Sequence, residues 1–220
     1  MIYEVQMFKD REEAGSLLAE EVKKVIKEKE NAVILAIPRG GVPVAYQISK
    51  KTGIPFSMVV SKKITFPYEP EAAIGAAAPD GTYILAPYYS ENSPEVKEAI
   101  KRAVNEAKEK MNKYLKGKEP DIKDKTVVIV DDGIATGYTA LVAGMYAKKK
   151  GASEVILAVP VCPSDSVKKA EEIFDKVICY NKVNSLFFAV GAYYQDFHQV
   201  SDSELEMYIK KAENEGLYYK

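Results

Sequence analysis

The sequence predicts an α/β domain in which a parallel sheet is covered by helices on both faces. Three observations predict it. Short apolar runs recur along the chain, and each is followed by a segment with helical spacing. The runs lack the alternation of a strand with one wet face, so they are expected to be buried on both faces. Helices that alternate with such strands are typical of doubly covered parallel sheets, which bind ligands at the carboxyl ends of their strands.

Size and charge set the limits for this fold. The chain has 220 residues, 47% of them hydrophobic, which predicts a single domain over 1–220, with a core from about 31 to 180 and a C-terminal hood or tail from about 181 to 220. The net charge of −1, from 31 basic and 32 acidic residues, offers no general attraction to nucleic acid or to a lipid surface.

Location and redox state are predicted from simple sequence signals. No apolar run approaches the ~18 residues of a membrane span, and the N-terminus has no basic flank followed by an apolar core. A cytoplasmic location is expected. The only cysteines, Cys162 and Cys179, are too few for a disulfide framework and are expected to be reduced thiols.

The first half of the chain contains elements with clear boundaries. Asp10 and Glu13 have the spacing of a capping box, which predicts a helix over 10–28. There follow a buried strand (32–38), a helix (42–53), a strand (55–63) and two extended pieces (72–86) that turn at Pro79-Asp80-Gly81.

A predicted loop and a long predicted helix come next in the middle of the chain. The stretch 62–71 contains two prolines and no periodicity, which predicts a mobile loop that acts as a lid. Ser93 and Pro94 then cap the most regular helix of the chain, expected over 93–115. The remaining elements are strands at 126–132, 154–161 and 176–180, and helices at 139–151 and 163–174.

The strand at 126–132 ends on two adjacent acids, Asp131 and Asp132, and leads into "GIATGYT". Backbone N–H groups of such a loop can surround an anion at the start of the next helix. The loop has no lysine where a nucleoside triphosphate would need one. Carboxylates accept hydrogen bonds from vicinal hydroxyls, so a sugar phosphate fits both halves of the motif.

A second anion site is predicted in "IPRGGVP", which also follows a buried strand and opens a helix. Arginine is rare in this sequence, occurring only at Arg11, Arg39 and Arg102. Its use within a glycine loop indicates a need for a planar fork of donors. Two anion sites with an acid pair between them fit a ligand that carries two phosphate groups separated by a ribose.

This combination resembles the type I phosphoribosyltransferases, whose signature of a strand, two acids and a loop ending in Thr-Gly-x-Thr matches "VVIVDDGIATGYT". The resemblance implies transfer of the 5-phosphoribosyl group from phosphoribosyl pyrophosphate to a nitrogen nucleophile, a glycosyltransferase reaction typical of nucleotide salvage. It implies a homodimer, a small-molecule acceptor, and Mg²⁺ held mainly through ligand oxygens and water, with Asp131 and Asp132 as candidate protein ligands.

The resemblance also assigns residues. Asp131 and Asp132 would hold the ribose hydroxyls, and the loop after them the 5-phosphate. "PRGG" would bind pyrophosphate, in a loop that commonly contains a cis peptide. The implied catalytic residues are Arg39, Lys62, Lys63, Asp131 and Asp132. The implied phosphoribosyl pyrophosphate contacts are Pro38, Arg39, Gly40, Gly41, Asp131, Asp132, Gly133, Ile134, Ala135, Thr136, Gly137, Tyr138 and Thr139.

The likeness extends to a group of uncharacterised phosphoribosyltransferases through "LAIPRGGVPVA" and "FFAVGAYYQDFHQVSDSEL". That group usually opens the lid with Arg-Lys, where this chain has Lys62 and Lys63, so the role of Lys63 is the better supported of the two. The 6-oxopurine enzymes of the family generally carry an aspartate at the position of Ala135. The loop instead resembles that of the adenine-type enzymes.

Other functions fit the sequence less well. A non-catalytic sensor of phosphoribosyl pyrophosphate needs a basic surface or a DNA-reading domain, and the sequence shows neither. A receiver domain would place its acid pair after the first strand. His198, the only histidine, is expected at a surface or a satisfied position. The aromatic residues Phe187, Phe188, Tyr193 and Tyr194 could stack on a nucleobase, although core packing is the commoner role.

Overall fold

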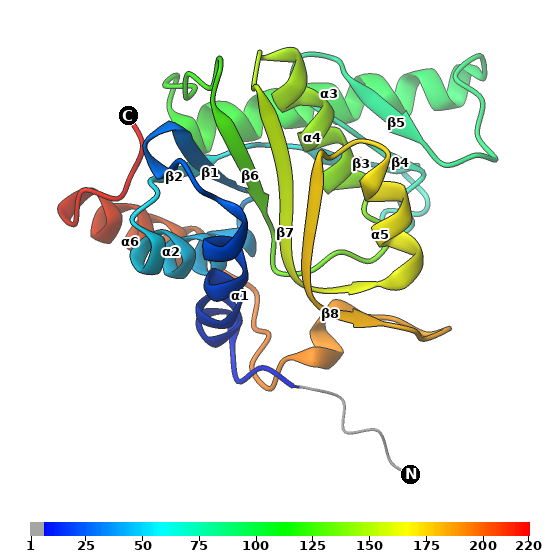
Figure 1. Ribbon diagram of the computed structural model, residues 1–220. Coiled ribbons are helices and arrows are strands. Elements are labelled where there is room, and N and C mark those ends of the chain that lie inside the picture. Colours follow the sequence, from blue (N-terminus) through cyan, green and yellow to red (C-terminus); the bar gives the residue numbers. More distant parts are fainter. Residues whose placement is uncertain (1–6) are drawn as a thin grey trace, which may run out of the picture.

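The centre of the molecule is a five-stranded parallel sheet with the strand order β2-β1-β6-β7-β8 (Figure 1). A computed structural model describes residues 7–220; the first six residues of the expected domain lie outside the described part. The strands are β1 (Ala32–Ala36), β2 (Phe56–Met58), β6 (Thr126–Val130), β7 (Glu154–Pro163) and β8 (Lys176–Val183). The predicted α/β class is confirmed.

Helices cover both faces of the sheet, because side chains of each strand alternate between two apolar clusters. Ile34 and Ala36 face α1 (Arg11–Val25), α2 (Gly41–Thr52) and α6 (Asp202–Asn214). Val33 and Leu35 face α4 (Tyr138–Lys149) and α5 (Ser164–Glu171). The continuous apolar runs of the sequence are thus explained by burial on both faces. Two 3₁₀ turns, Lys29–Asn31 and Val190–Tyr193, complete the helical elements.

A small antiparallel sheet lies beside the main one, with the order β3-β4-β5. Its strands are β3 (Lys62–Ile64), β4 (Gly75–Ala77) and β5 (Tyr83–Leu85), and α3 (Pro94–Leu115) packs against it. The predicted turn is confirmed: Gly81 has φ of 94°, and the Asp80 carboxylate accepts a hydrogen bond of 2.9 Å from the Thr82 N–H.

The segment 62–71, predicted as a loop, begins with a strand. Lys62, Lys63 and Ile64 pair with β4, and both Ile64 and Phe66 are buried. Apolar side chains at these two positions fill the space between the small sheet and α3. Their burial favours an ordered strand here, and the two prolines lie further along the segment. Only 67–71 is exposed throughout. The mobility of that shorter segment stays a prediction.

The C-terminal part of the chain does more than cover one end of the sheet. After β8 it forms the turn Val190–Tyr193, then crosses to α6, which packs on α2. The tail ends beside the opposite edge strand, where Tyr218 forms a bridge with Phe56 of β2 (Figure 1). The segment expected as a hood therefore ties the two edges of the sheet together.

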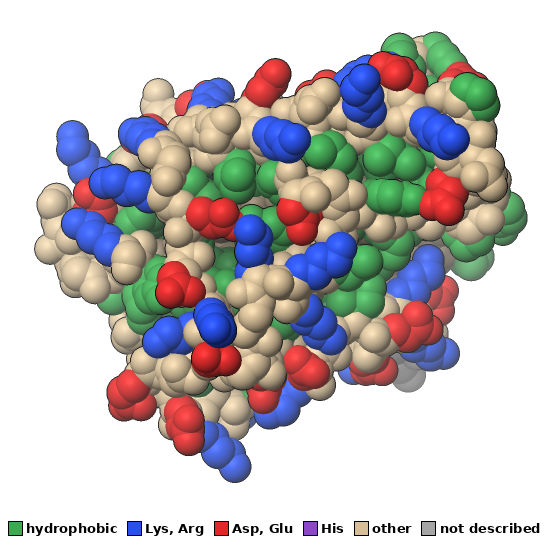
Figure 2. All heavy atoms as spheres, turned by 90° about the horizontal axis from the view of Figure 1, so that it is seen from above, with side chains coloured by type: hydrophobic (Ala, Val, Ile, Leu, Met, Phe, Trp, Pro, Cys, Tyr) green, Lys and Arg blue, Asp and Glu red, His purple; other side chains and the backbone are tan. Residues whose placement is uncertain are grey.

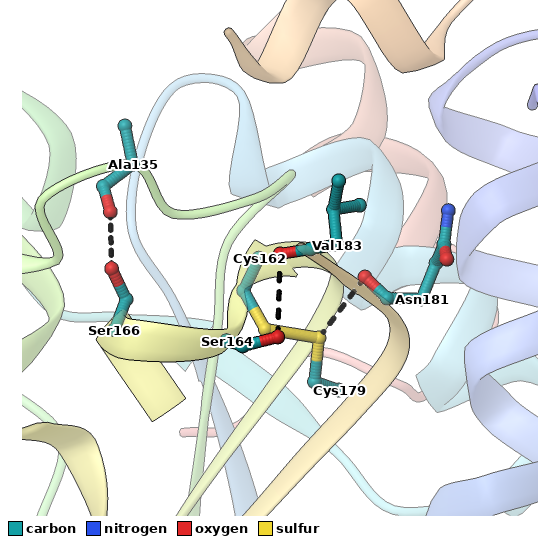
Figure 3. The surroundings of a disulfide bond; sticks show 7 residues. All are labelled: Ala135, Cys162, Ser164, Ser166, Cys179, Asn181 and Val183. Carbon is teal, nitrogen blue, oxygen red and sulfur yellow. Dashed lines mark hydrogen bonds between the residues drawn. A yellow bond between two sulfur atoms is a disulfide. The ribbon is translucent and has the colours of Figure 1, made fainter. Parts of the chain in front are cut away.

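The expectation of two reduced thiols is wrong in this structure. Cys162 of β7 and Cys179 of β8 form a disulfide (Figure 3). Parallel pairing sets Val159 opposite Cys179 and Cys162 opposite Lys182, so the two thiols lie on neighbouring strands. Sequence spacing alone does not reveal this pairing.

The outer surface shows no concentration of one charge on the face seen in Figure 2, where acidic and basic side chains are interspersed. Within residues 7–220, no helix combines the length and the apolar character that crossing a bilayer requires.

Candidate functional site

Two loops meet at the carboxyl ends of β1 and β6, two adjacent strands of the sheet. The strands are parallel, with Ala36 opposite Val130, and the ladder continues past them as the Ile37 N–H donates to the Val130 carbonyl at 2.9 Å. The loop that begins at Pro38 and the loop that begins at Asp131 therefore leave the sheet side by side. The structure brings together the two predicted anion sites.

Gly40 and Gly41 let these loops approach each other closely. A Cβ at Gly40 would lie 2.3 Å from Asp132 Oδ2, and one at Gly41 would lie 2.7 Å from the Val130 carbonyl oxygen. At Gly41 the neighbour is backbone, so a side chain there would displace the strand; at Gly40 a side chain would push the Asp132 carboxylate away from Arg11. The Pro38–Arg39 peptide is cis, as the family resemblance implies.

The acid pair is held in a largely desolvated position. Burial raises the pKa of Asp131, and the neighbouring Asp132 charge raises it further. Burial also raises the pKa of Asp132, while the Arg11 guanidinium opposes that rise. The Asp132 N–H donates to Asp131 Oδ1 at 2.8 Å. Ligand hydroxyl groups or cations would compensate these carboxylates, which suits them to bind a diol.

Arg11 was not among the predicted site residues. Its Nε donates to Asp132 Oδ2 at 3.0 Å, and its Nη1 donates to the His198 carbonyl at 2.6 Å. The guanidinium carbon lies 4.1 Å from the centre of the Phe197 ring, where a cation is attracted to the ring face. The rarity of arginine was a usable signal, since it applies to Arg11 as much as to Arg39.

The loop after the acids leads into the start of α4. Gly137 has φ of 82° and precedes the helix, so Tyr138 and Thr139 stand in its first turn, where N–H groups have no partner within the helix. Ala135 and Thr136 are exposed at the tip. Ser166 of α5 donates to the Ala135 carbonyl (Figure 3). The Gly133–Thr139 loop, predicted to bind an anion, thus lies at the start of α4 and is anchored from α5.

A carboxylate from the C-terminal helix lies against the loop that contains Arg39. Asp202, the first residue of α6, has Oδ1 at 3.6 Å from Arg39 Nη1. Its other oxygen accepts from Lys113 at 2.7 Å, and the Tyr114 hydroxyl donates to Oδ1 at 2.9 Å. These contacts join α3, α6 and the loop of Arg39. Neither Lys113 nor Asp202 was predicted from the sequence.

Lys62 and Lys63 point to different faces because they are adjacent in a strand. Lys62 is partly buried, and its charge acts on Lys110 of α3 together with those of Arg39 and Asp131. Lys63 is exposed. In this structure Lys62 acts on the charged groups of the site, while the preference for Lys63 drawn from the family resemblance stays a prediction.

The remaining candidate residues lie in the C-terminal segment. His198 is held between Asp196, at 2.8 Å from Nδ1, and Glu204, at 2.9 Å from Nε2, and these hydrogen bonds raise its pKa. The expectation of a satisfied histidine is confirmed. The aromatic residues divide: Tyr193 and Tyr194 are buried, whereas Phe187 is 93% exposed.

A magnesium ion would find few protein ligands here. Within 7–220, no group of three or more His, Cys, Asp or Glu side chains could hold a metal. Mg²⁺ often keeps several waters and takes one or two carboxylates together with ligand phosphates. Asp131 fits that arrangement, since Asp132 Oδ2 already accepts from Arg11.

Comparison with known proteins agrees with this geometry. Residues 5–196 match the phosphoribosyl transferase domain family. Two curated proteins of Mycobacterium tuberculosis, named "Putative phosphoribosyl transferase Rv0571c" (strain H37Rv) and "Putative phosphoribosyl transferase MT0597" (strain CDC 1551), are each 34% identical over 213 residues. The match covers 94% of this chain and 47% of either relative, so the chain spans about half their length.

A solved structure shows the same fold over nearly the whole chain. The crystal structure of TT1426 from Thermus thermophilus is 32% identical, covers 93% of this chain and 98% of its own, and superposes with a TM-score of 0.76. The range matched by the family model, residues 5–196, contains both the acid pair and the Pro-Arg-Gly-Gly loop. The chain belongs to the phosphoribosyl transferase domain family.

Proposed function

We propose that this chain transfers the 5-phosphoribosyl group of phosphoribosyl pyrophosphate to a nitrogen of a small acceptor, a nucleobase or a related compound, and releases pyrophosphate. One observation carries the proposal. The acid pair and the Pro-Arg-Gly-Gly loop follow adjacent parallel strands, and a Cβ at Gly40 would lie 2.3 Å from Asp132 Oδ2. Carboxylates suited to a diol thus adjoin a loop suited to an anion, which supports phosphoribosyl pyrophosphate as the ligand.

The residues divide the work according to charge. Asp131 accepts hydrogen bonds from the ribose hydroxyls, and the start of α4 with Thr139 binds the 5-phosphate. Arg39 and Lys62 face the pyrophosphate. When the bond between C1 and the pyrophosphate oxygen breaks, its electron pair leaves with pyrophosphate, and the ribose ring becomes positive until the acceptor nitrogen bonds to C1. The cations stabilise the leaving group.

Mg²⁺, when bound, would neutralise part of the pyrophosphate charge. Asp131 is its proposed protein ligand, with ligand oxygens and water completing the coordination. Water must be kept from C1 because it competes with the acceptor. The exposed segment 67–71, which follows the strand of Lys62, is the proposed lid.

Binding of magnesium phosphoribosyl pyrophosphate tests this function directly. Calorimetry should detect binding by the unmodified chain, and Asp131→Asn should weaken it severely by removing a charged acceptor. Asp131 is a better position for this substitution than Asp132, because replacing Asp132 would also leave Arg11 without its partner. Equal affinities for the two proteins would contradict the ribose assignment.

A non-catalytic regulator that binds phosphoribosyl pyrophosphate is the second candidate. It is favoured by the contact of Asp202 with Arg39, which ties the anion loop to α6 and would let ligand binding alter the C-terminal helix. Release of pyrophosphate in the presence of acceptors separates the two functions. A single domain over 1–220 and a cytoplasmic location complete the proposal on the length and the sequence signals, and a homodimer and a role in nucleotide salvage complete it on the family resemblance.

A further inference from the structure

A lysine of α3 stands among the charges of the proposed pyrophosphate site. Lys110 precedes Lys113 and Tyr114 by three and four residues, so the three side chains share one face of the helix. Lys113 and Tyr114 both contact Asp202, which faces Arg39. That face of α3 is therefore directed at the anion loop, and Lys110 lies one turn nearer the start of the helix.

The charges that act on Lys110 come from four parts of the chain that are remote from it in sequence. Lys62 of β3 and the loop residue Arg39 lower its pKa, whereas Asp131 and Asp202 raise it. Burial is the largest cause of the shift, and the pKa falls to about 8. The influence is mutual, since Lys110 lowers the pKa of Asp131. Lys110 thus belongs to one electrostatic group with the acid pair and the pyrophosphate loop.

Lys110 has no direct partner in this group. Among the residues that the structure describes, none forms a hydrogen bond with it or an ion pair within 4.0 Å. Over the same residues, every fully buried side-chain nitrogen and oxygen does have a hydrogen-bond partner. The Lys110 ammonium is therefore not sealed from solvent, and its donors can reach a ligand.

We propose that Lys110 is a third cationic residue for the pyrophosphate of phosphoribosyl pyrophosphate, acting together with Arg39 and Lys62. This rests on the proposed function. Three cations held near one another repel, and a lysine is costly to desolvate without an anion. A multiply charged anion bound between them would offset that cost. Asp131 and Asp202 alone leave an excess of positive charge, and neither reaches Lys110 within ion-pair distance.

A structural role for Lys110 is the competing explanation. In that case the ammonium would only balance the buried Asp131 carboxylate, and its loss would raise the pKa of Asp131 and weaken ribose binding together with pyrophosphate binding. The two explanations differ in which half of the ligand loses affinity, so the halves are measured separately, as magnesium pyrophosphate and as ribose 5-phosphate.

The experiment compares Lys110→Met, Lys110→Arg and the unmodified chain by calorimetry. Lys108→Met is the matched control, because Lys108 lies on the same helix and is exposed. We expect Lys110→Met to weaken magnesium pyrophosphate binding roughly tenfold to a hundredfold, the usual size of a contact with a charged group. Ribose 5-phosphate binding should stay within about twofold, and Lys110→Arg should retain most of the pyrophosphate affinity.

The pH dependence of pyrophosphate affinity, measured beside that of ribose 5-phosphate affinity, is a second readout, because a structural role of Lys110 would change both affinities together. A lysine with a pKa of about 8 is charged at neutral pH and loses its charge as the pH rises, so pyrophosphate affinity should fall above about pH 8. Lys110→Arg keeps its charge and should lose less affinity over that range. Protonation of pyrophosphate itself is common to both proteins and cancels in the comparison.

Each outcome decides between the explanations. Unchanged pyrophosphate affinity in Lys110→Met, or equal losses for pyrophosphate and ribose 5-phosphate, would overturn the role of Lys110 while leaving the proposed function intact. Failure of the unmodified chain to bind either compound would overturn both. If Lys110→Met fails to fold, Lys110→Arg still tests the proposal. A folded Lys110→Arg protein whose pyrophosphate affinity has the pH profile of the unmodified chain would contradict it.

Discussion

Arg11 and Asp132 form an ion pair of 3.0 Å across 121 positions of sequence. The side chains are only 8% and 14% exposed, and Tyr194 donates to the Asp132 carbonyl at 2.5 Å from the other side. One acid of the proposed ribose site is thus fastened to the first helix and to the C-terminal segment. Parts of the chain that carry no signature motif thereby hold a signature residue in position.

Arg11→Ala should destabilise the fold. It leaves the buried Asp132 carboxylate without its cation, and breaking one side of a buried pair typically costs about 3 kcal/mol or more. Urea unfolding would measure the loss of unfolding free energy. Arg102→Ala is a suitable control, since Arg102 has no ion pair within the described residues and should change stability by less than about 0.5 kcal/mol. If the two substitutions lowered the unfolding free energy equally, the Arg11–Asp132 ion pair would not be important for stability.

The same pair should control the acid side of the pH profile. Burial raises the pKa of Asp132, and Arg11 holds that rise down. Arg11→Met therefore raises the pKa of Asp132, so its carboxylate protonates at a higher pH. Binding of phosphoribosyl pyrophosphate, which needs the ionised acid, should then fail at a higher pH on acidification than in the unmodified chain. Calorimetry over a pH series would reveal the shift, and superimposable profiles would refute it.

Arg39 and Asp202 should affect pyrophosphate binding in opposite directions. Arg39→Lys replaces a fork of donors by a point charge, which should weaken pyrophosphate binding by about tenfold. Asp202→Asn removes a carboxylate that lies 3.6 Å from Arg39 and competes with the ligand. Because this contact is partly exposed, we expect a gain of about fivefold at most. Inhibition by pyrophosphate, compared among the three proteins, would test both signs, and weaker binding in Asp202→Asn would contradict the competition.

The disulfide should stabilise the pairing of β7 with β8. It joins cysteines 17 residues apart, and closing a loop of that size typically contributes about 3 kcal/mol. Reduction, or Cys179→Ala, should lower the midpoint of thermal unfolding. Mass spectrometry after thiol alkylation would show whether the purified chain contains the bond. Two alkylated cysteines under non-reducing conditions would contradict it and restore the expectation of free thiols.

The acceptor should not be a 6-oxopurine. Ala135, at the loop tip, has no group to exchange a proton with the base, and such help typically contributes ~100-fold or more. Hypoxanthine and guanine are therefore expected to be poor acceptors, and adenine or a non-purine to be better. The comparison is kcat/KM for the three purines on one preparation. Efficient turnover of hypoxanthine or guanine would mean that another residue performs the proton chemistry.

The parallel sheet and the two ligand loops could be predicted from the amino-acid sequence. Their signals are local: apolar runs for strands buried on both faces, helical spacing between them, and glycines with acids at strand ends. That ligands bind at the carboxyl ends of the strands also followed from the fold class, whereas the adjacency of β1 and β6, which brings the two loops together, came from the structure. The predicted helix near Asp10 was correct in type and began at Arg11, although it ends at Val25 rather than at 28.

The contacts of the distant side chains that complete the site were decided only by the tertiary structure. Lys110 has the sequence context of an ordinary charged residue on a surface helix, and the rarity of arginine marks Arg11 without showing which residue it contacts. Helical spacing does not show where a charged side chain points once the helix has packed. The strand at Lys62 and the Cys162–Cys179 pair depend on neighbours that are remote in sequence. In each case the deciding energy is a contact across the fold, which local propensity does not contain.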